Sequence, residues 1–213
     1  MYFFPGCKYR AHNPEGTQKL EQYLNDRFGT ITMDCCSMDF DKPTLPDSVI
    51  FQCPTCGLIL SESGSGYPMQ SLYEFLLSDH DYPWPDYGAA KMTLQDCWRS
   101  RNNIDHLDAI RAVIKKMNIQ AFELECRRSK ADFCGATLYR TPSERYQTLA
   151  YQNLVVNGNF QPCSEETQTR KMLEHGKQYA TNDILCYCTG CMEGIKMSGH
   201  NPIHLLDLMV STL

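Results

Sequence analysis

The sequence predicts an α/β fold built from two related halves, each a small, mostly parallel sheet with flanking helices. Short apolar segments alternate with longer segments of helical periodicity, a pattern that favours parallel strands joined by helices. Most of the twelve cysteines in the 213-residue chain also form two groups with the same internal order. Each group has a lone cysteine, then a central cysteine or cysteine pair, then a Cys-x-x-Cys. The repeated order therefore predicts a repeated structural unit.

The first half is expected to begin with an aromatic strand at 2–4, which ends at the Pro5-Gly6 turn and leaves Cys7 in a loop. A helix is expected over 17–28, because its apolar residues share one face and Gly29 follows it. The remaining elements predicted for this half are strands at 30–33 and 48–51 and a helix at 69–77. The strands deliver the adjacent pair Cys35-Cys36 and then Cys53.

The second half is expected to repeat this arrangement. A strand at 91–94 leads to Cys97, and a strand at 183–187 leads to Cys188. Pro142 suits the first turn of a helix. The other predicted elements are a strand at 121–124 and helices at 105–117, 143–155, 165–179 and 202–209. The segment 79–88 separates the two cysteine groups, so we place the halves at 1–85 and 86–213.

The cysteines repeatedly follow the carboxyl ends of predicted strands. Ligands of open α/β sheets bind in the crevice beyond these ends. Each half is therefore expected to gather its cysteines at one sheet edge, with the two edges facing a shared cleft. The first cysteine group is Cys7, Cys35, Cys36, Cys53 and Cys56, and the second cysteine group is Cys97, Cys134, Cys188 and Cys191.

Metal or cluster binding is the leading interpretation of these groups, since thiolates select Zn, Cu(I) and iron–sulfur centres. A disulfide framework is the rival reading. The chain is long enough to bury a core without such staples, and its N-terminus lacks a signal-peptide pattern. Adjacent cysteines and Cys-x-x-Cys pairs are also poor geometry for structural bridges. Outside both groups, Cys126, Cys163 and Cys186 are expected to be buried and inert.

The composition and the missing motifs argue against several functional classes. The formal net charge is −5, and no basic stripe indicates nucleic-acid binding. The apolar segments are too short for a membrane span, so a cytoplasmic protein is expected. The sequence contains no dinucleotide fingerprint, phosphate loop or ferredoxin-type cysteine run. Any redox chemistry would therefore draw electrons from a separate flavin or ferredoxin-type iron–sulfur subunit.

The cysteine pattern resembles the cysteine-rich CCG domain. That domain occurs in the catalytic B subunit of heterodisulfide reductase and in related redox subunits. The likeness extends over nearly the whole chain as two domain copies. Its first copy is carried by Phe4-Pro-Gly-Cys7, Cys35-Cys36 and Cys53-Pro-Thr-Cys56, and its second by Gln95-Asp96-Cys97, Phe133-Cys134-Gly135 and Cys188-Thr-Gly-Cys191. The chain departs from the family at Ser37, where a glycine is usual, and at Phe133.

The resemblance implies a noncubane [4Fe-4S] cluster on the five thiolates of the first group, with Cys35 and Cys36 at the catalytic centre. Phe133 stands where the second copy would carry another cysteine, which leaves four thiolates. Four suit a [4Fe-4S] cubane or a zinc ion. The implied function is reduction of a small disulfide, or thiol oxidation. The alternative is a non-catalytic electron-transfer or scaffold subunit of a larger redox complex.

Basic residues follow both lone cysteines at matching positions. They are Lys8 and Arg10 after Cys7, and Arg99 and Arg101 after Cys97. Such residues could place positive charge at the cleft and favour thiolates and anionic substrates. They could equally be ordinary surface charges.

Overall fold

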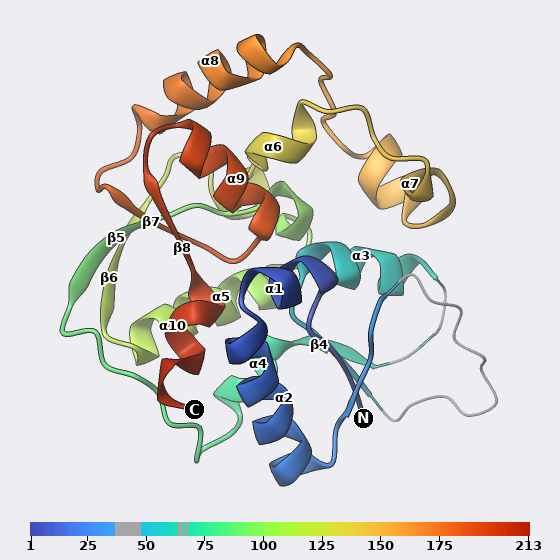
Figure 1. Ribbon diagram of the computed structural model, residues 1–213, viewed down its shortest axis with the longest axis vertical. Coiled ribbons are helices and arrows are strands. Elements are labelled where there is room, and N and C mark those ends of the chain that lie inside the picture. Colours follow the sequence, from blue (N-terminus) through green and yellow to red (C-terminus); the bar gives the residue numbers. More distant parts are fainter. Residues whose placement is uncertain (37–47, 64–65, 67) are drawn as a thin grey trace.

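Two four-stranded parallel sheets form the framework of the protein (Figure 1). The computed structural model describes residues 1–36, 48–63, 66 and 68–213. The strand orders are β2-β1-β3-β4 and β6-β5-β7-β8, so both halves arrange their strands in the same way. All described strand pairs are parallel. The predicted α/β fold with two related halves is confirmed.

The first sheet is short, and its central strands are buried. In the register, Tyr2 of β1 lies opposite both Ile31 and Val49. The elements are β1 (Tyr2–Phe4), α1 (Cys7–His12), α2 (Pro14–Phe28), β2 (Ile31–Thr32), β3 (Val49–Phe51), α3 (Pro54–Glu62), β4 (Met69–Ser71) and α4 (Leu72–Leu77).

The half of the chain that contains the second sheet has more helices than the first half. Its first elements are β5 (Ala90–Leu94), η1 (Trp98–Ser100), α5 (Ile104–Lys116), β6 (Ile119–Glu123), η2 (Arg128–Lys130), α6 (Gly135–Leu138), α7 (Arg145–Thr148) and the π-helix η3 (Tyr151–Val156). Its last are α8 (Glu165–Gly176), β7 (Asp183–Cys186), α9 (Thr189–Met197), β8 (Asn201–His204), α10 (Leu205–Met209) and η4 (Val210–Thr212).

The two halves pack against each other reciprocally. The helix after the fourth strand of the first sheet, α4, packs on α5 of the second half. The corresponding C-terminal elements, α10 and η4, lie beside α2 of the first half (Figure 1). Tyr82 and Tyr87, between the halves, donate hydrogen bonds to the backbone oxygens of Met209 and Leu208. A single apolar core therefore runs through both halves.

Several element predictions were wrong in their boundaries. Cys7 does not lie in a loop but begins α1, because Gly6 turns the chain at φ 81° directly into a helix. The helix expected at 143–155 is broken into α7 and η3, since Ala150 adopts a left-handed conformation at φ 55°. The helix expected at 165–179 ends at Gly176.

Two predicted helices begin later than expected, and each is preceded by a strand. Residues 69–71 form β4, and α4 starts only after Ser71, whose side chain and backbone form a capping box with Glu74. In the same way β8 occupies 201–204, and His204 caps α10 by accepting from the Leu206 amide. Helices α3 and α9, which follow the Cys-x-x-Cys strands, were not predicted.

Every helix in the described ranges is too short or too polar to span a bilayer.

Candidate metal centre

The second cysteine group forms a compact, buried cluster. Its members are Cys97, Cys134, Cys188 and Cys191. Their four sulfur atoms all lie within 4.8 Å of one another, and the Cys134 and Cys188 sulfurs are 3.8 Å apart. All four side chains are buried, with Cys188 the most exposed at 5%. Four thiols brought together in this way could hold a metal ion or a cluster.

Helix beginnings and close helix packing place these sulfurs. Cys188 is the N-cap of α9 and Cys134 the N-cap of α6. Gly135 lets the two helices approach, because a Cβ there would lie 2.7 Å from the Cα of Gly194. Gly190 is similarly required, because a Cβ on it would lie 3.0 Å from the Cys134 sulfur. Larger residues at these positions would push the ligand-bearing helices apart.

Two donors point at the Cys134 sulfur. Arg99 Nη1 and Thr137 Oγ1 each lie 2.9 Å from it. Hydrogen bonds from the neighbouring thiols lower the pKa of Cys134 well below its usual value, and the charge of Arg99 adds to this effect. Burial raises the pKa of Cys97 and Cys191 well above the usual value. The donors around Cys134 therefore favour thiolate character at this sulfur.

A separate network fixes the backbone at Cys97. The Cys97 amide donates to the Tyr187 hydroxyl at 3.1 Å, which in turn donates to the Asp96 carboxylate at 3.0 Å. Arg111 pairs with the same buried carboxylate at 2.6 Å. Asp96 is thereby held as an anchor for the cysteine loop, and its oxygens are already engaged.

Phe133 packs in the core rather than beside the four sulfurs. Its ring stacks on His175 with centroids 4.2 Å apart. His175 is fixed in turn by Gln95, whose side-chain oxygen lies 2.8 Å from Nε2. The position at which the resemblance would place a further cysteine is thus filled by packed side chains.

The first cysteine group comes from three places, namely the start of α1, the segment after β2 and the start of α3. Cys53 is the N-cap of α3, and Cys56 lies in its first turn. The Cys56 thiol hydrogen-bonds with Cys36 and Cys53, which lowers the pKa of both and brings that of Cys53 to about 6. Backbone amides at the start of α3 add to the effect on Cys53. Cys7 is exposed at the start of α1, and Cys35 is half-buried.

One small pocket brings the two cysteine groups together. It has a volume of about 60 Å³, and Cys188 of the second group contributes to its wall. Three basic side chains also line it, namely Lys8, Arg99 and Arg145. Its cysteines from the first group are Cys7, Cys36, Cys53 and Cys56. Cys35 is not among the lining residues.

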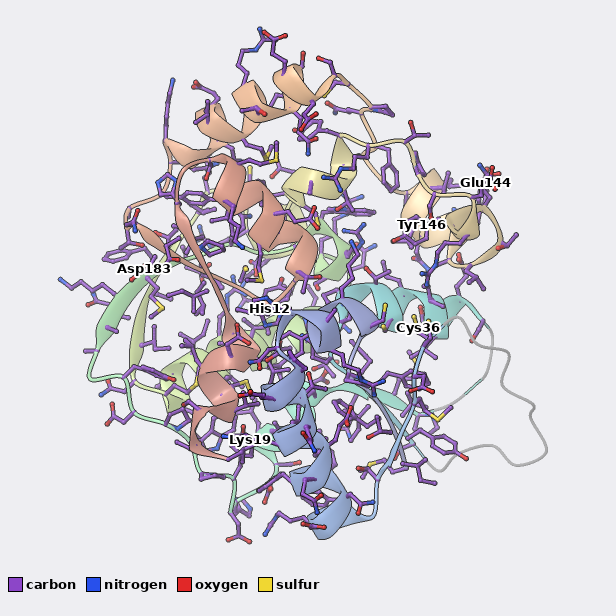
Figure 2. The ribbon with its side chains drawn as sticks, in the orientation of Figure 1. His12, Lys19, Cys36, Glu144, Tyr146 and Asp183 are labelled. Atoms are coloured by element: carbon purple, nitrogen blue, oxygen red, sulfur yellow. The ribbon has the colours of Figure 1, made fainter. Side chains whose placement is uncertain are left out.

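The second half closes this pocket with α7. Figure 2 shows Tyr146 on α7 above Cys36, and both residues line the pocket. Burial lowers the pKa of Arg145, but the negative charges of Cys36, Tyr146, Cys35 and Cys7 outweigh it and raise that pKa overall. Arg145 therefore lies in the field of the first cysteine group although it belongs to the other half.

The remaining sequence predictions have mixed outcomes. Arg10 pairs with Glu21 and Asp34, and Arg101 donates to the backbone oxygen of Asn157, so neither serves the pocket. Outside the two groups, Cys186 is buried as expected. The same expectation was wrong for Cys126, which is exposed, and for Cys163, which is half-buried.

Sequence reasoning missed Thr137, Arg145 and Tyr187. Thr137 follows Cys134 by one helical turn, and Tyr187 directly precedes Cys188, so both positions carried a local signal. Arg145 carried none, because it reaches the first cysteine group only through the folding of α7 over α3.

Comparisons with known proteins name no family. No family model matches the chain, and no curated protein matches it. Among solved structures, the glutamate racemase isoform RacE1 from Bacillus anthracis is similar over 98% of this chain and 77% of its own, with 8% identity and a TM-score of 0.33. A likeness at this level carries no inference about fold or activity.

Proposed function

We propose that this chain is a cytoplasmic thiol–disulfide oxidoreductase subunit of the heterodisulfide reductase B type. The observation that supports the proposal is the pocket that both cysteine groups line, together with Lys8, Arg99 and Arg145. In the proposed reaction a small disulfide accepts two electrons and two protons and yields two thiols, or the reverse. The electrons come from a flavin or ferredoxin-type iron–sulfur subunit.

The first cysteine group fits a noncubane [4Fe-4S] cluster by its donor chemistry. Its members are cysteines without disulfide bonds, and those at the start of α3 have thiols whose pKa values are shifted by mutual hydrogen bonds. Four of them face one pocket, and Cys35 adjoins Cys36. When bound, such a cluster would supply exposed iron to which a substrate sulfur can bind.

For the second cysteine group we propose a single tetrahedral ion in place of a cubane. Zinc–sulfur bonds of about 2.3 Å place the sulfurs of a tetrahedral site roughly 3.8 Å apart; the Cys134–Cys188 separation is 3.8 Å, and all four sulfurs lie within 4.8 Å of one another. The thiolates of a cubane bind four different irons and must stand wider apart. Zinc, or a single iron, is therefore the proposed occupant.

The chain's own basic residues suit an anionic substrate. Lys8 and Arg145 are exposed at the pocket, and Arg99 is buried behind it. Their charges would attract a thiolate or an acidic disulfide and hold it against the first cysteine group. Arg99 also stabilises thiolate character at Cys134.

The alternative is a non-catalytic electron-transfer or scaffold role, and the burial of the second group favours it in part. A closed site with four protein thiolates leaves no open position for a substrate. In that case the second site would hold α6 and α9 together, and the first would only relay electrons.

The test is anaerobic purification followed by counting iron, acid-labile sulfide and zinc. The proposal expects about four irons and four sulfides per chain, and one further metal ion at the second site. Disulfide reduction with a strong artificial donor should then be lost in Cys36→Ser and kept in Cys126→Ser, an exposed cysteine outside both groups. Iron-free protein with zinc at both sites would overturn the proposal. Direct turnover with NADH or NADPH would contradict the need for a partner.

A further inference from the structure

A second pocket lies on the other face of α3, away from the cysteines. Its volume is about 500 Å³, and most of its lining comes from α3 of the first half and from residues between 99 and 106 of the second. From α3 it takes Pro54, Gly57, Leu58 and Ser61, which recur at helical spacing along one face. No described cysteine lines it.

The wall formed by the second half carries polar atoms that are buried and unpaired. Within the described part of the chain, Arg99 Nε, Ser100 Oγ and both ring nitrogens of His106 have no hydrogen-bond partner. These three residues are at most 5% exposed, and all three line the pocket. Buried polar atoms are almost always paired, because an unpaired one has lost its hydrogen bonds to water without replacement. Three such residues at one pocket indicate a ligand that pairs with them.

The buried charge at this wall is positive, because it is the guanidinium of Arg99, which stays protonated in proteins. The wall also includes the beginning of α5, where the Asn103 side chain accepts from the His106 amide and where the positive end of the helix dipole lies. The lining contains one carboxylate among the described residues, that of Asp105, and this residue is exposed. An oxyanion would satisfy the unpaired donors.

Apolar side chains line the rest of the pocket. Leu58 and Met69 come from the first half, and Ile104, at the start of α5, is 47% exposed although it is large and apolar. A ligand that uses both the polar and the apolar lining must carry an anionic head and a short apolar tail.

We propose that this pocket binds a small organic acid, whose carboxylate or phosphate group meets Arg99, Ser100 and His106 and whose apolar part packs on Leu58, Met69 and Ile104. The site is separate from the pocket of the two cysteine groups, and Arg99 alone lines both. The proposal therefore does not depend on the proposed redox function.

The experiment is isothermal titration of the anaerobically purified, metal-loaded protein with four probes. Hexanoate and hexyl phosphate carry the two possible head groups, hexanol lacks the charge, and acetate lacks the tail. At least one of the two acids should bind saturably and about tenfold more tightly than hexanol or acetate, and its identity assigns the head group. No saturable binding of either acid, or hexanol binding as tightly, would overturn the proposal.

A matched pair of serine variants tests the location. Ser100 Oγ is unpaired, whereas Ser61 Oγ on the same pocket donates to the Leu58 backbone oxygen at 2.9 Å. Ser100→Ala should weaken acid binding about tenfold, since it removes a hydrogen bond to a charged group. Ser61→Ala should leave binding unchanged. Equal effects of the two substitutions would contradict the assignment.

Two further variants separate this pocket from the cysteine pocket and test its apolar wall. Arg145→Gln should not alter acid binding, because Arg145 lines only the cysteine pocket of the two. Ile104→Ser should remove the preference for hexanoate or hexyl phosphate over acetate. Because Ile104 is half exposed, this change should leave the melting temperature nearly unaltered. Loss of binding in Arg145→Gln would place the acid at the cysteines and refute the proposal.

Discussion

The guanidinium of Arg99 donates a 2.9 Å hydrogen bond to the Cys134 sulfur, and both side chains are buried. A buried cation is stable only beside a negative partner. A site of four thiolates carries excess negative charge even with a divalent ion bound. Arg99 therefore supplies a fixed positive charge beside the four-cysteine site. The positive charge stabilises the thiolates, and the thiolates stabilise the buried guanidinium.

Arg99→Gln should weaken metal retention at the second site. Groups that hydrogen-bond to metal ligands typically change metal affinity about 10- to 100-fold when they are removed. We expect metal loss to a chelator to be at least about tenfold faster than in the unaltered protein. Arg101→Gln is the matched control, because Arg101 bonds only to the backbone oxygen of Asn157 in the described structure. Equal rates in both variants would show that Arg99 does not support the site.

If both cysteine groups hold metals as proposed, they should lose them independently. Cys134→Ser removes a ligand from the buried cluster, whereas Cys36→Ser alters only the group at α3. Metal counts and EPR spectra of anaerobic protein should show one site damaged and the other intact in each variant. If both substitutions abolished the same signal, the groups would form one centre.

The repeated sheets could be predicted because strand and helix alternation depends on local apolar patterns. The order of the cysteines predicted which four would meet at the second site, since residues after the strands of one parallel sheet share an edge. The helices α3 and α9 were missed because Cys-Gly-Leu-Ile-Leu and Cys-Met-Glu-Gly-Ile are short, and short apolar segments do not separate strand from helix.

The partners of the cysteines were harder to predict than the cysteines. Arg99 was visible as a charge beside Cys97, but its contact with Cys134 depends on the folding of α6 against η1. Arg145 reaches the first group across the two halves, a relationship that no spacing in the sequence encodes. His106 follows the helical pattern of α5, and only the structure shows its unpaired ring among Phe51, Tyr73 and Tyr187.

Replacing His106 by leucine should stabilise the protein without ligand. Both ring nitrogens of His106 are buried and unpaired, and an apolar residue there avoids a cost of about 1–3 kcal/mol. Urea unfolding at pH 7 should show the gain as a higher midpoint with an unchanged slope. Gln168→Leu is the control, because the Gln168 side chain donates to the Gly135 backbone oxygen, so its removal should destabilise.

The same substitution should flatten the pH dependence of stability. Burial lowers the pKa of His106 to about 4 from its ordinary 6.5, so the unfolded state takes up a proton first as the pH falls. Stability should therefore decline between about pH 6.5 and 4, by at most about 3 kcal/mol for this residue. Burial also lowers the pKa of His204 to about 4, so the part of the stability loss that comes from His204 should remain in His106→Leu. Parallel curves for the two proteins would contradict this.

Ala89→Gly should stabilise the protein, although glycine usually destabilises. Ala89 is exposed and has φ 63°, a left-handed conformation that costs an alanine about 1 kcal/mol. Ala112→Gly in the middle of α5 is the contrasting substitution and should cost about 1 kcal/mol. Thermal unfolding of both variants measures the difference. A loss of stability in both would mean that the turn before β5 is not strained.

Asp207→Asn should loosen the contact between the two halves. Asp207, on α10, accepts hydrogen bonds of 2.8 Å from Tyr9 and Asn13 and pairs with His12 at 2.8 Å, all on the first half. Burial by itself raises the pKa of Asp207, but the three contacts outweigh it and lower the pKa overall. The stabilisation that they give is therefore present at neutral pH and is lost as the pH falls through the lowered pKa.

At neutral pH the asparagine variant should lose roughly 1–3 kcal/mol, because an amide cannot accept from all three donors as a carboxylate does. Hydrogen exchange should rise mainly in α1 and α10, where the halves meet. Asp26→Asn, at an exposed residue that bonds only to Gln22 of its own helix in the described structure, is the control and should change neither measurement. If exchange rose equally along α5 and α8, the effect would be global rather than a loosening of this contact.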